Sequence, residues 1–228
     1  KYDMDYQHLV LWDAKQLELV GAYRLACAQD IIEKHGRKGL YTDSLFSYSD
    51  DMAPYFEKGI ELGRSFVQPK YWGRKSLDYL WFGIGAFVNR YPQYRYLFGA
   101  VSVSNALPEQ AKSLLVHYYQ HYYGAEQLLA IPNNEFRHTE QQKEQCAQLF
   151  MGNDIKEDFV ELKHVLANIG AQVPTLFKQY TELCEPGGVQ FLSFSIDPEF
   201  NNCIDGLVLV DLDKVKPSKA KRYLGQSR

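Results

Sequence analysis

A chain of 228 residues, 46% of them apolar, can bury a substantial core and is interpreted as a single domain, residues 1–228. Its formal charge of −3 excludes the strongly basic balance typical of nucleic-acid-binding modules. The four cysteines are scattered without a C-x-x-C pair, so neither a zinc site nor a disulfide framework is predicted, and a cytoplasmic location is favoured.

The apolar segments are too short to cross a bilayer. The longest, residues 77–88, contains Asp78, so we expect any membrane contact to be peripheral, at the inner face of the membrane. The chain begins at Lys1 without an initiator methionine, which is compatible with a piece of a longer protein.

In chain order, the first predicted unit is a β-hairpin of residues 8–13 and 18–27. The two-residue period of a strand places Arg24 on one face with apolar neighbours. Two interpretations stay open for Arg24. Its stem could cover apolar surface while its head reaches solvent, or its guanidinium could face a site built around Glu61.

The central segment is predicted as strand, turn, helix and strand. Residues 60–68 form an apolar strand that carries Glu61 and Arg64, and a basic turn leads into a helix that begins near Arg74. Residues 94–104 then form a second strand, so the segment predicts a right-handed parallel βαβ unit. The basic first turn of this helix is unfavourable unless an anion such as a phosphate lies over its free N–H groups.

The remaining elements follow from periodicity and turn signals. A short helical turn and a basic loop are predicted over residues 30–42. Residues 130–137 are predicted as a loop, and the tail from residue 214 as loosely held. The other predicted helices cover residues 50–58, 105–124, 140–150, 159–169 and 174–184, and the late strands cover 189–196 and 203–212.

Several of these segments together resemble a known family. They are residues 20–25 (VGAYRL), 61–67 (ELGRSFV), 96–99 (YLFG), 102–105 (SVSN), 185–188 (EPGG) and 204–208 (IDGLV). The combined pattern is similar to the GNAT-fold N-acyltransferases over nearly the whole chain. Within them it resembles the bacterial ornithine-lipid N-acyltransferases, often labelled hemolysins, and more distantly the acyl-homoserine-lactone synthases. The resemblance implies an α/β fold with a mixed, splayed central sheet flanked by helices.

The chemistry of amine acylation needs a base, because an amine is mostly protonated at neutral pH and must lose a proton before it attacks a thioester. Glu61 is the candidate, and it resembles a matching glutamate of the lactone synthases. The alternative is a surface glutamate paired with a nearby lysine. Arg64 lies three positions on, which places it on the opposite strand face unless the strand is bulged, and Gly63 permits a bulge. Arg64 and Arg24 could hold a substrate carboxylate or pair with Glu61.

The donor site is implied mainly by the resemblance. The turn after the central strand keeps one glycine and adds bulk, which departs from the usual coenzyme A turn of the family. The resemblance implies an acyl carrier protein thioester as the donor instead of acyl-coenzyme A. Backbone N–H groups beside the splayed strands, those of Phe66 and Val67, would bind the phosphopantetheine arm. Its phosphate would lie in the turn, at Gly73, Arg74, Lys75 and Ser76. Asn105, past the second strand, would anchor the second wall of the donor site. A solvated cationic turn and an ordinary turn role for Asn105 are the alternatives.

Other chemistries are not predicted. Packing is favoured for Tyr118, Tyr119 and Tyr122, although one of them could protonate the leaving thiolate. His117 and His121 are the one histidine pair at helical spacing, and without an intervening glutamate in the metalloprotease arrangement they predict no metal site. No G-x-S-x-G elbow is present.

The sequence therefore predicts an enzyme without a permanent cofactor. We expect it to move a (3-hydroxy)fatty acyl group from an acyl carrier protein to the amine of an amino acid or lyso-aminolipid. A non-catalytic module that binds an acyl carrier or lipid is the alternative, and a literal pore-forming hemolysin is disfavoured because nothing spans a bilayer.

Overall fold

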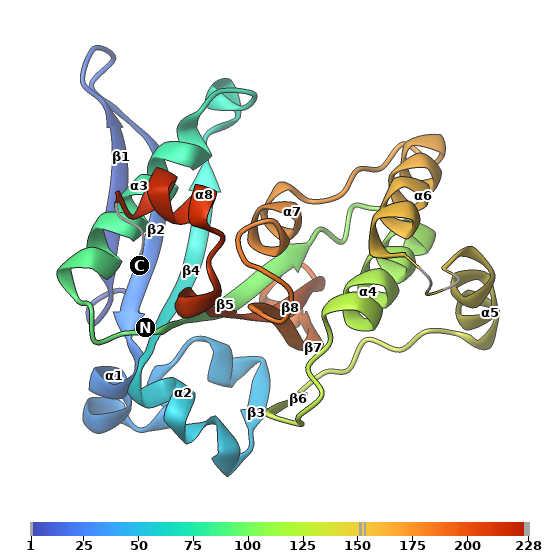
Figure 1. Cartoon of the computed structure of the whole chain (residues 1–228), viewed down its shortest axis with the longest axis horizontal. Helices are drawn as coiled ribbons and strands as arrows, with labels where there is room; N and C mark the ends of the chain where they lie inside the picture. Colours follow the sequence, from blue (N-terminus) through green and yellow to red (C-terminus); the bar gives the residue numbers. More distant parts are fainter. Residues whose placement is uncertain (1, 151, 153, 226–228) are drawn as a thin grey trace.

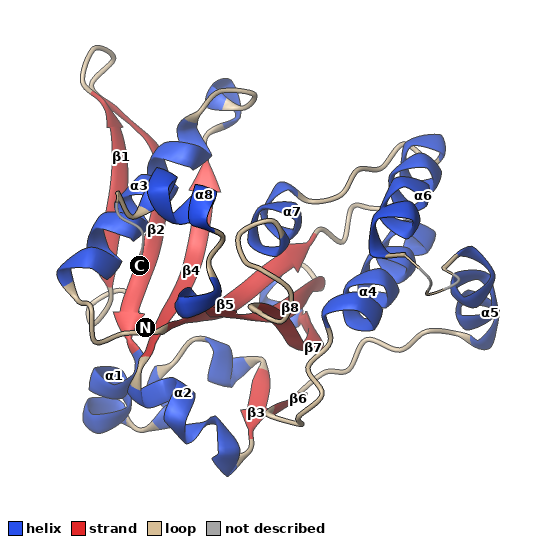
Figure 2. Ribbon diagram, viewed as in Figure 1, coloured by secondary structure: helices blue, strands red, loops and turns tan. Residues whose placement is uncertain are grey.

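The computed structural model describes residues 2–150, 152 and 154–225. A six-stranded mixed sheet with strand order β1-β2-β4-β5-β8-β7 forms its centre (Figures 1 and 2). Its strands are β1 (Gln7–Asp13), β2 (Glu18–Cys27), β4 (Gly59–Val67), β5 (Tyr96–Val103), β7 (Val189–Asp197) and β8 (Cys203–Asp211). Two short strands, β3 (Phe46–Tyr48) and β6 (Ala130–Pro132), pair separately.

Helices and short segments cover both faces of this sheet (Figure 1). The helices are α1 (Ala28–His35), α2 (Ala53–Glu57), α3 (Ser76–Arg90), α4 (Glu109–Tyr123), α5 (Glu140–Leu149), α6 (Ile155–Asn168), α7 (Thr175–Thr181) and α8 (Pro217–Tyr223). The larger apolar core joins one face to α3, α4, α6, α7 and α8. The smaller core joins the opposite face to α1, α2, β3 and β6, because side chains alternate between the faces along each strand.

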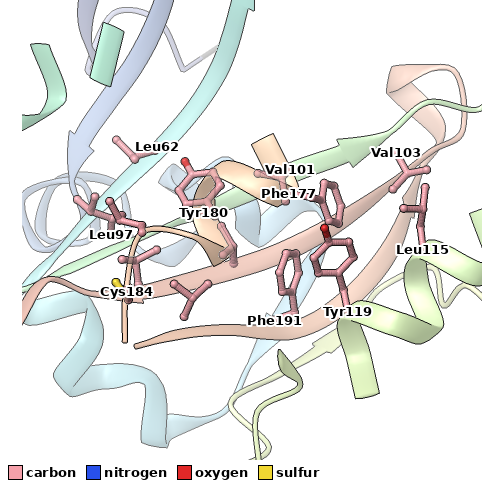
Figure 3. Close-up of a cluster of buried hydrophobic side chains, with 14 of the residues drawn as sticks. Leu62, Leu97, Val101, Val103, Leu115, Tyr119, Phe177, Tyr180, Cys184 and Phe191 are labelled. Carbon is pink, nitrogen blue, oxygen red and sulfur yellow. The ribbon is translucent and has the colours of Figure 1, made fainter. Parts of the chain in front are cut away.

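Aromatic packing fills the larger core. The rings of Phe177 and Phe191 stack with centroids 5.2 Å apart, and the ring centroids of Tyr119 and Phe177 are 4.9 Å apart (Figure 3). Tyr118 and Tyr119 are 1% and 0% exposed, so the predicted packing role is confirmed for both. Each such buried aromatic ring contributes roughly 1.5–3 kcal/mol relative to an exposed one.

The central βαβ unit forms as predicted. β4 and β5 are parallel neighbours, and α3 is the crossover between them. They pair over three positions, Gly59 with Tyr96, Ile60 with Leu97 and Glu61 with Phe98, and beyond Glu61 the two strands separate. β5 instead continues its pairing with β8 as far as Val103. The predicted mixed, splayed sheet is therefore present.

A close backbone approach marks the point where β4 and β5 separate. A Cβ atom added to Gly99 would lie 2.0 Å from the carbonyl oxygen of Leu62. Because no side chain fits in that distance, glycine is required where the two strands begin to diverge.

Two local predictions are wrong. The tail from residue 214 is not loose, because α8 packs on α3, where the Tyr223 hydroxyl donates to Asp78 at 2.8 Å and Asn89 donates to the Leu224 carbonyl at 2.7 Å. The predicted loop 130–137 contains β6, which pairs with β3. Three-residue strands carry too little periodicity to be found from sequence. No helix among the described residues is long and apolar enough to span a membrane.

Candidate active site

Glu61 lies at the vertex of the separated strands, as the last β4 residue that pairs with β5. Its side chain is 1% exposed on the face covered by α1 and α2. It accepts four hydrogen bonds: from the Tyr6 hydroxyl, from the N–H of Tyr41 at 3.2 Å, and from the N–H and hydroxyl of Thr42 at 2.7 and 2.6 Å. The 3₁₀ turn at Thr42–Ser44 leaves these N–H groups free for the carboxylate.

The burial of Glu61 strengthens it as a proton acceptor. Burial raises the pKa of its carboxyl group, and the hydrogen bonds from Thr42 and Tyr6 and from the backbone partly oppose that rise. The interpretation of Glu61 as a surface glutamate paired with a lysine is wrong, because the side chain is enclosed and its partners are hydroxyl and amide groups. Its role as the base stays a prediction.

Arg24 faces this site rather than solvent. It lies opposite Gly63 in the sheet, its side chain is 2% exposed, and it donates to Asp3 Oδ1 at 2.8 Å. Its guanidinium carbon lies 4.6 Å from the centroid of the Tyr6 ring and 5.4 Å from that of Tyr41. Its Nε and Nη2 atoms have no hydrogen-bond partner among the described residues. The interpretation of Arg24 as a solvent-reaching arginine is therefore wrong.

Arg64 lies in a β-bulge of β4, and its side chain is exposed. The register between β2 and β4 shifts between Ala22 and Arg24, and Arg64 adopts φ 50°. Its charge adds to the hydrogen bond from Arg24 in lowering the pKa of Asp3, so Arg64 lies near this cluster. Within the described part of the chain, no ion pair joins Glu61 to Arg24 or Arg64. The suggestion that an arginine fixes Glu61 by pairing with it is therefore wrong.

A pair of buried acids, which sequence reasoning missed, extends the polar face toward β7 and β8. The Tyr41 hydroxyl donates to Asp197 at 3.0 Å, and the Ser102 hydroxyl donates to Asp205. Burial raises the pKa of Asp205 to about 6, and the charge of Asp197 adds to the rise. One signal was available, because Asp205 is the one acid inside the otherwise apolar segment 203–210.

We expect Asp205→Asn to flatten part of the pH dependence of stability. The folded pKa of about 6 exceeds the unfolded value of 3.8, so the folded protein binds more protons between them, and stability should fall as pH rises through that window. The loss attributable to Asp205 is roughly 2–3 kcal/mol. Urea unfolding of both proteins at pH 4 and pH 8 checks this. Equal pH dependence in the two proteins would contradict it.

Two of the residues predicted to bind the acyl donor, Phe66 and Val67, lie at the end of β4. The N–H of Gln68 donates to the Val20 carbonyl of β2 at 2.8 Å. Because successive N–H groups of a strand alternate in direction, the N–H of Val67 points toward the side from which β5 has separated, whereas that of Phe66 points toward β2. Val67 thus fits the predicted backbone donor and Phe66 does not.

The predicted phosphate turn precedes α3, which begins at Ser76 rather than near Arg74. Its Gly73 has φ 72°, Arg74 and Lys75 are exposed, and Ser76 is buried with its hydroxyl directed at the Tyr71 carbonyl at 3.4 Å. The prediction of a basic first turn for this helix is wrong, because the first turn of α3 contains the acidic Asp78. No side chain among the described residues caps the start of α3, so its first N–H groups remain available to an anion.

Asn105 lies in the turn between β5 and α4, as its alternative interpretation held. Its side-chain oxygen accepts a hydrogen bond from Lys112 Nζ at 2.8 Å. This contact holds the start of α4 and leaves the side-chain amide nitrogen as the group that a donor could contact. The role of Asn105 in the second wall of the acyl-donor site stays a prediction.

A pocket opens beside Tyr6. It has a volume of about 260 Å³ and is lined by Tyr2, Asp5, Tyr6, His35, Lys38 and Gly39. Tyr6 connects this pocket to the buried carboxylate, because its hydroxyl donates to Glu61.

The mixed, splayed sheet flanked by helices is consistent with a GNAT-like fold. Residues 1–82 match the model of the acetyltransferase (GNAT) domain. The chain is 25% identical over 228 residues to the glycine N(alpha)-acyltransferase of Phocaeicola vulgatus, a match that covers 96% of this chain and 69% of that protein. The protein of the same description from Bacteroides thetaiotaomicron is also 25% identical, over 96% of this chain and 67% of its own length.

A third relative is similar over a shorter stretch. The L-ornithine N(alpha)-acyltransferase of Rhizobium meliloti is 31% identical over 125 residues, which cover 51% of this chain and 41% of that protein. No solved structure matches the chain significantly. The predicted resemblance to GNAT-type N-acyltransferases is confirmed by these similarities.

Proposed function

We propose that this protein is an N-acyltransferase that moves a (3-hydroxy)fatty acyl group from an acyl carrier protein thioester to the amine of a small amino acid, such as glycine or ornithine, or of a lyso-aminolipid. The separation of β4 and β5 directly beyond Glu61 carries the proposal. It leaves unpaired backbone of both strands next to a buried acid. The similarity to glycine and ornithine N(alpha)-acyltransferases supports the class of acceptor.

The donor lies along the separated part of β4 in this proposal. The thioester carbonyl is placed near the vertex, and the phosphopantetheine arm follows the free N–H side of Val67 toward the uncapped start of α3. The phosphate then meets Gly73, Arg74, Lys75 and Ser76, where the exposed cations and free N–H groups favour an anion. No bound metal or permanent cofactor is needed for direct transfer.

The acceptor occupies the pocket beside Tyr6. The Tyr6 oxygen takes the proton from the substrate ammonium group while its own proton passes to Glu61, and the freed amine attacks the thioester carbon. The carbon–sulfur bond then breaks, and the leaving thiolate takes the second proton, which the nitrogen loses as the amide forms. Arg24, with two unpartnered nitrogen atoms among the described residues, is suited to the substrate carboxylate once side chains move to admit it.

A direct assay tests the activity. The purified chain is mixed with acyl carrier protein thioester or acyl-coenzyme A and with glycine, ornithine or a lyso-aminolipid, and thiol release and N-acyl product are measured. We expect release with the acyl carrier thioester and at least one amine. Absence of thiol release with every pair would contradict the enzyme proposal, and faster turnover with acyl-coenzyme A would contradict the choice of donor.

One observation favours a second function, a non-catalytic module that binds an acyl carrier or lipid. Both oxygens of Glu61 already accept hydrogen bonds from the protein, as expected of a purely structural carboxylate. The two functions differ in one readout. A binding module would retain the acyl carrier and yield no N-acyl product, even with the preferred amine.

Peripheral contact with a membrane fits a lipid product. The hairpin between β1 and β2 lies beside the turn after β4, since Lys70 pairs with Glu18 (Figure 1). Trp12, Leu17 and Trp72 are 54%, 73% and 69% exposed in this region. Exposed aromatic and aliphatic side chains next to cations suit the interface of an anionic bilayer.

A further inference from the structure

Three metal-ligating side chains meet beside α4, away from the separated strands. They are His117 of α4, His138 of the loop before α5 and Cys146 of α5, and one ligand atom of each lies within 4.8 Å of the other two. The sequence shows the helical pair His117 and His121, but the fold adds His138 and Cys146 from a different segment. Two imidazoles and a thiolate are ligands that zinc prefers in proteins.

The hydrogen bonding of His138 is that of a metal ligand. Its Nε2 atom lies 3.0 Å from the carbonyl oxygen of Ser113. A carbonyl oxygen can only accept, so Nε2 carries the proton and Nδ1 keeps a free lone pair. A ligating histidine commonly donates its other N–H to a carbonyl in this way, which fixes the ring and its tautomer.

His117 and Cys146 are also suited to a metal. The His117 ring is half-buried, and in its neutral form it offers a nitrogen lone pair to a metal. Cys146 is 1% exposed within the larger core, and its sulfur lies 3.9 Å from the Ser113 hydroxyl. Zinc would replace the thiol proton, releasing one proton to solvent.

The geometry needs a small adjustment. Zn–N bonds of about 2.0–2.1 Å and Zn–S bonds of about 2.3 Å place tetrahedral ligand atoms roughly 3.3–3.6 Å apart. The ligand atoms here are separated by up to 4.8 Å, so the three side chains must approach by about an ångström. His138 lies in an irregular segment, where such a movement needs no change in a helix.

The helix α5 is held by few side chains: besides Cys146, Leu149 and the following Phe150 pack on the larger core. Within α5, all of whose residues the structure describes, Cys146 is the buried residue, and the helix has 10 residues. A helix this short is marginal in water unless tertiary contacts stabilise it. A bond from Cys146 through a metal to His117 would supply such a contact.

We propose that His117, His138 and Cys146 bind a zinc ion that fixes α5 and the preceding loop against α4, with a water molecule as the fourth ligand. The site is structural, and it is independent of the acyl transfer proposed above. Co²⁺ serves as the spectroscopic probe, because a thiolate ligand gives a charge-transfer band and tetrahedral geometry gives intense visible bands.

The test uses the purified full chain, stripped of metal and titrated with Zn²⁺ and Co²⁺. We expect one equivalent to bind, the thiolate band to appear with Co²⁺, and amide exchange in α5 to slow with Zn²⁺. Cys146→Ser should remove the band, and Cys146→Ser or His138→Asn should each weaken Zn²⁺ binding by about 100-fold.

Matched variants separate this site from chance binding. Cys27→Ser, in β2, and His164→Asn, on the exposed side of α6, should leave the affinity and the cobalt spectrum unchanged. His138 is half-buried in a loop, so its variant should remain folded even if Cys146→Ser does not. Equal Zn²⁺ affinity in the wild type and His138→Asn, or no stoichiometric binding by the wild type, would overturn the proposal.

Discussion

Replacement of Glu61 by glutamine should abolish acyl transfer and destabilise the fold. The carboxylate accepts four hydrogen bonds from Tyr6, Tyr41 and Thr42. A glutamine side chain has only one acceptor oxygen, and its NH₂ group would face hydrogen-bond donors with which it cannot pair. With buried groups left unpaired, we expect a loss of about 2–4 kcal/mol in the free energy of unfolding. Without a proton acceptor, turnover should fall by about 10²–10⁴-fold.

Tyr6→Phe separates the catalytic loss from the structural one. It removes the hydroxyl through which the proton is proposed to pass, while the three donors from Tyr41 and Thr42 remain on Glu61. Stability should change by about 1 kcal/mol, and turnover should fall nearly as far as in Glu61→Gln. Urea unfolding and N-acyl product formation measure the two effects. Full activity in both variants, assayed while folded, would eliminate Glu61 as the base.

Gly99→Ala should be the most disruptive single-methyl substitution near the site. Its Cβ atom would lie 2.0 Å from the Leu62 carbonyl oxygen, so β4 and β5 must move apart where they are last held together. Overpacking against backbone offers no flexible side chain that could yield. We expect a loss of about 2–4 kcal/mol in stability and a large rise in KM for the acyl donor.

The matched control is Gly63→Ala, on the neighbouring strand. A Cβ atom added to Gly63 meets no atom within 4 Å, and Gly63 does not have a positive φ. Its stability should therefore change by less than about 1 kcal/mol. Thermal unfolding of both variants tests the comparison, and a Gly99→Ala protein as stable as Gly63→Ala would show that the close approach imposes no constraint.

The central unit was predictable because its signals are local. The apolar strand 60–68, the turn at Gly73 and the apolar period of α3 are each contained within a few residues, and together they specify a parallel crossover. The bulge in β4 was anticipated from Gly63, but Arg64 adopts the positive φ. A non-glycine residue in this left-handed conformation is uncommon, so the residue pattern alone does not predict it.

The partners of the site were not predictable because they come from distant segments. Tyr6, Tyr41 and Thr42 converge on Glu61 over separations of up to 55 residues. Asp197 meets Tyr41 across 156 residues. Such polar contacts depend on the register of whole elements, and no spacing rule in one sequence encodes them. Arg24 shows the same limit. The two-residue period of β2 predicted the face of the sheet on which Arg24 lies, but not the aromatic rings around its guanidinium group.

The pairing of β4 with β5 forms a seam with fewer paired positions than any other pair of neighbouring strands of the large sheet. Three paired positions connect the half formed by β1, β2 and β4 to the half formed by β5, β8 and β7, whereas β5 and β8 are paired over eight. The backbone hydrogen bonds at residues 59–61 should therefore open at a free energy below that of global unfolding, while both apolar cores keep the two halves packed together. Amide protons at this seam should exchange sooner than those between β5 and β8, and a bound acyl chain bridging both halves should slow them.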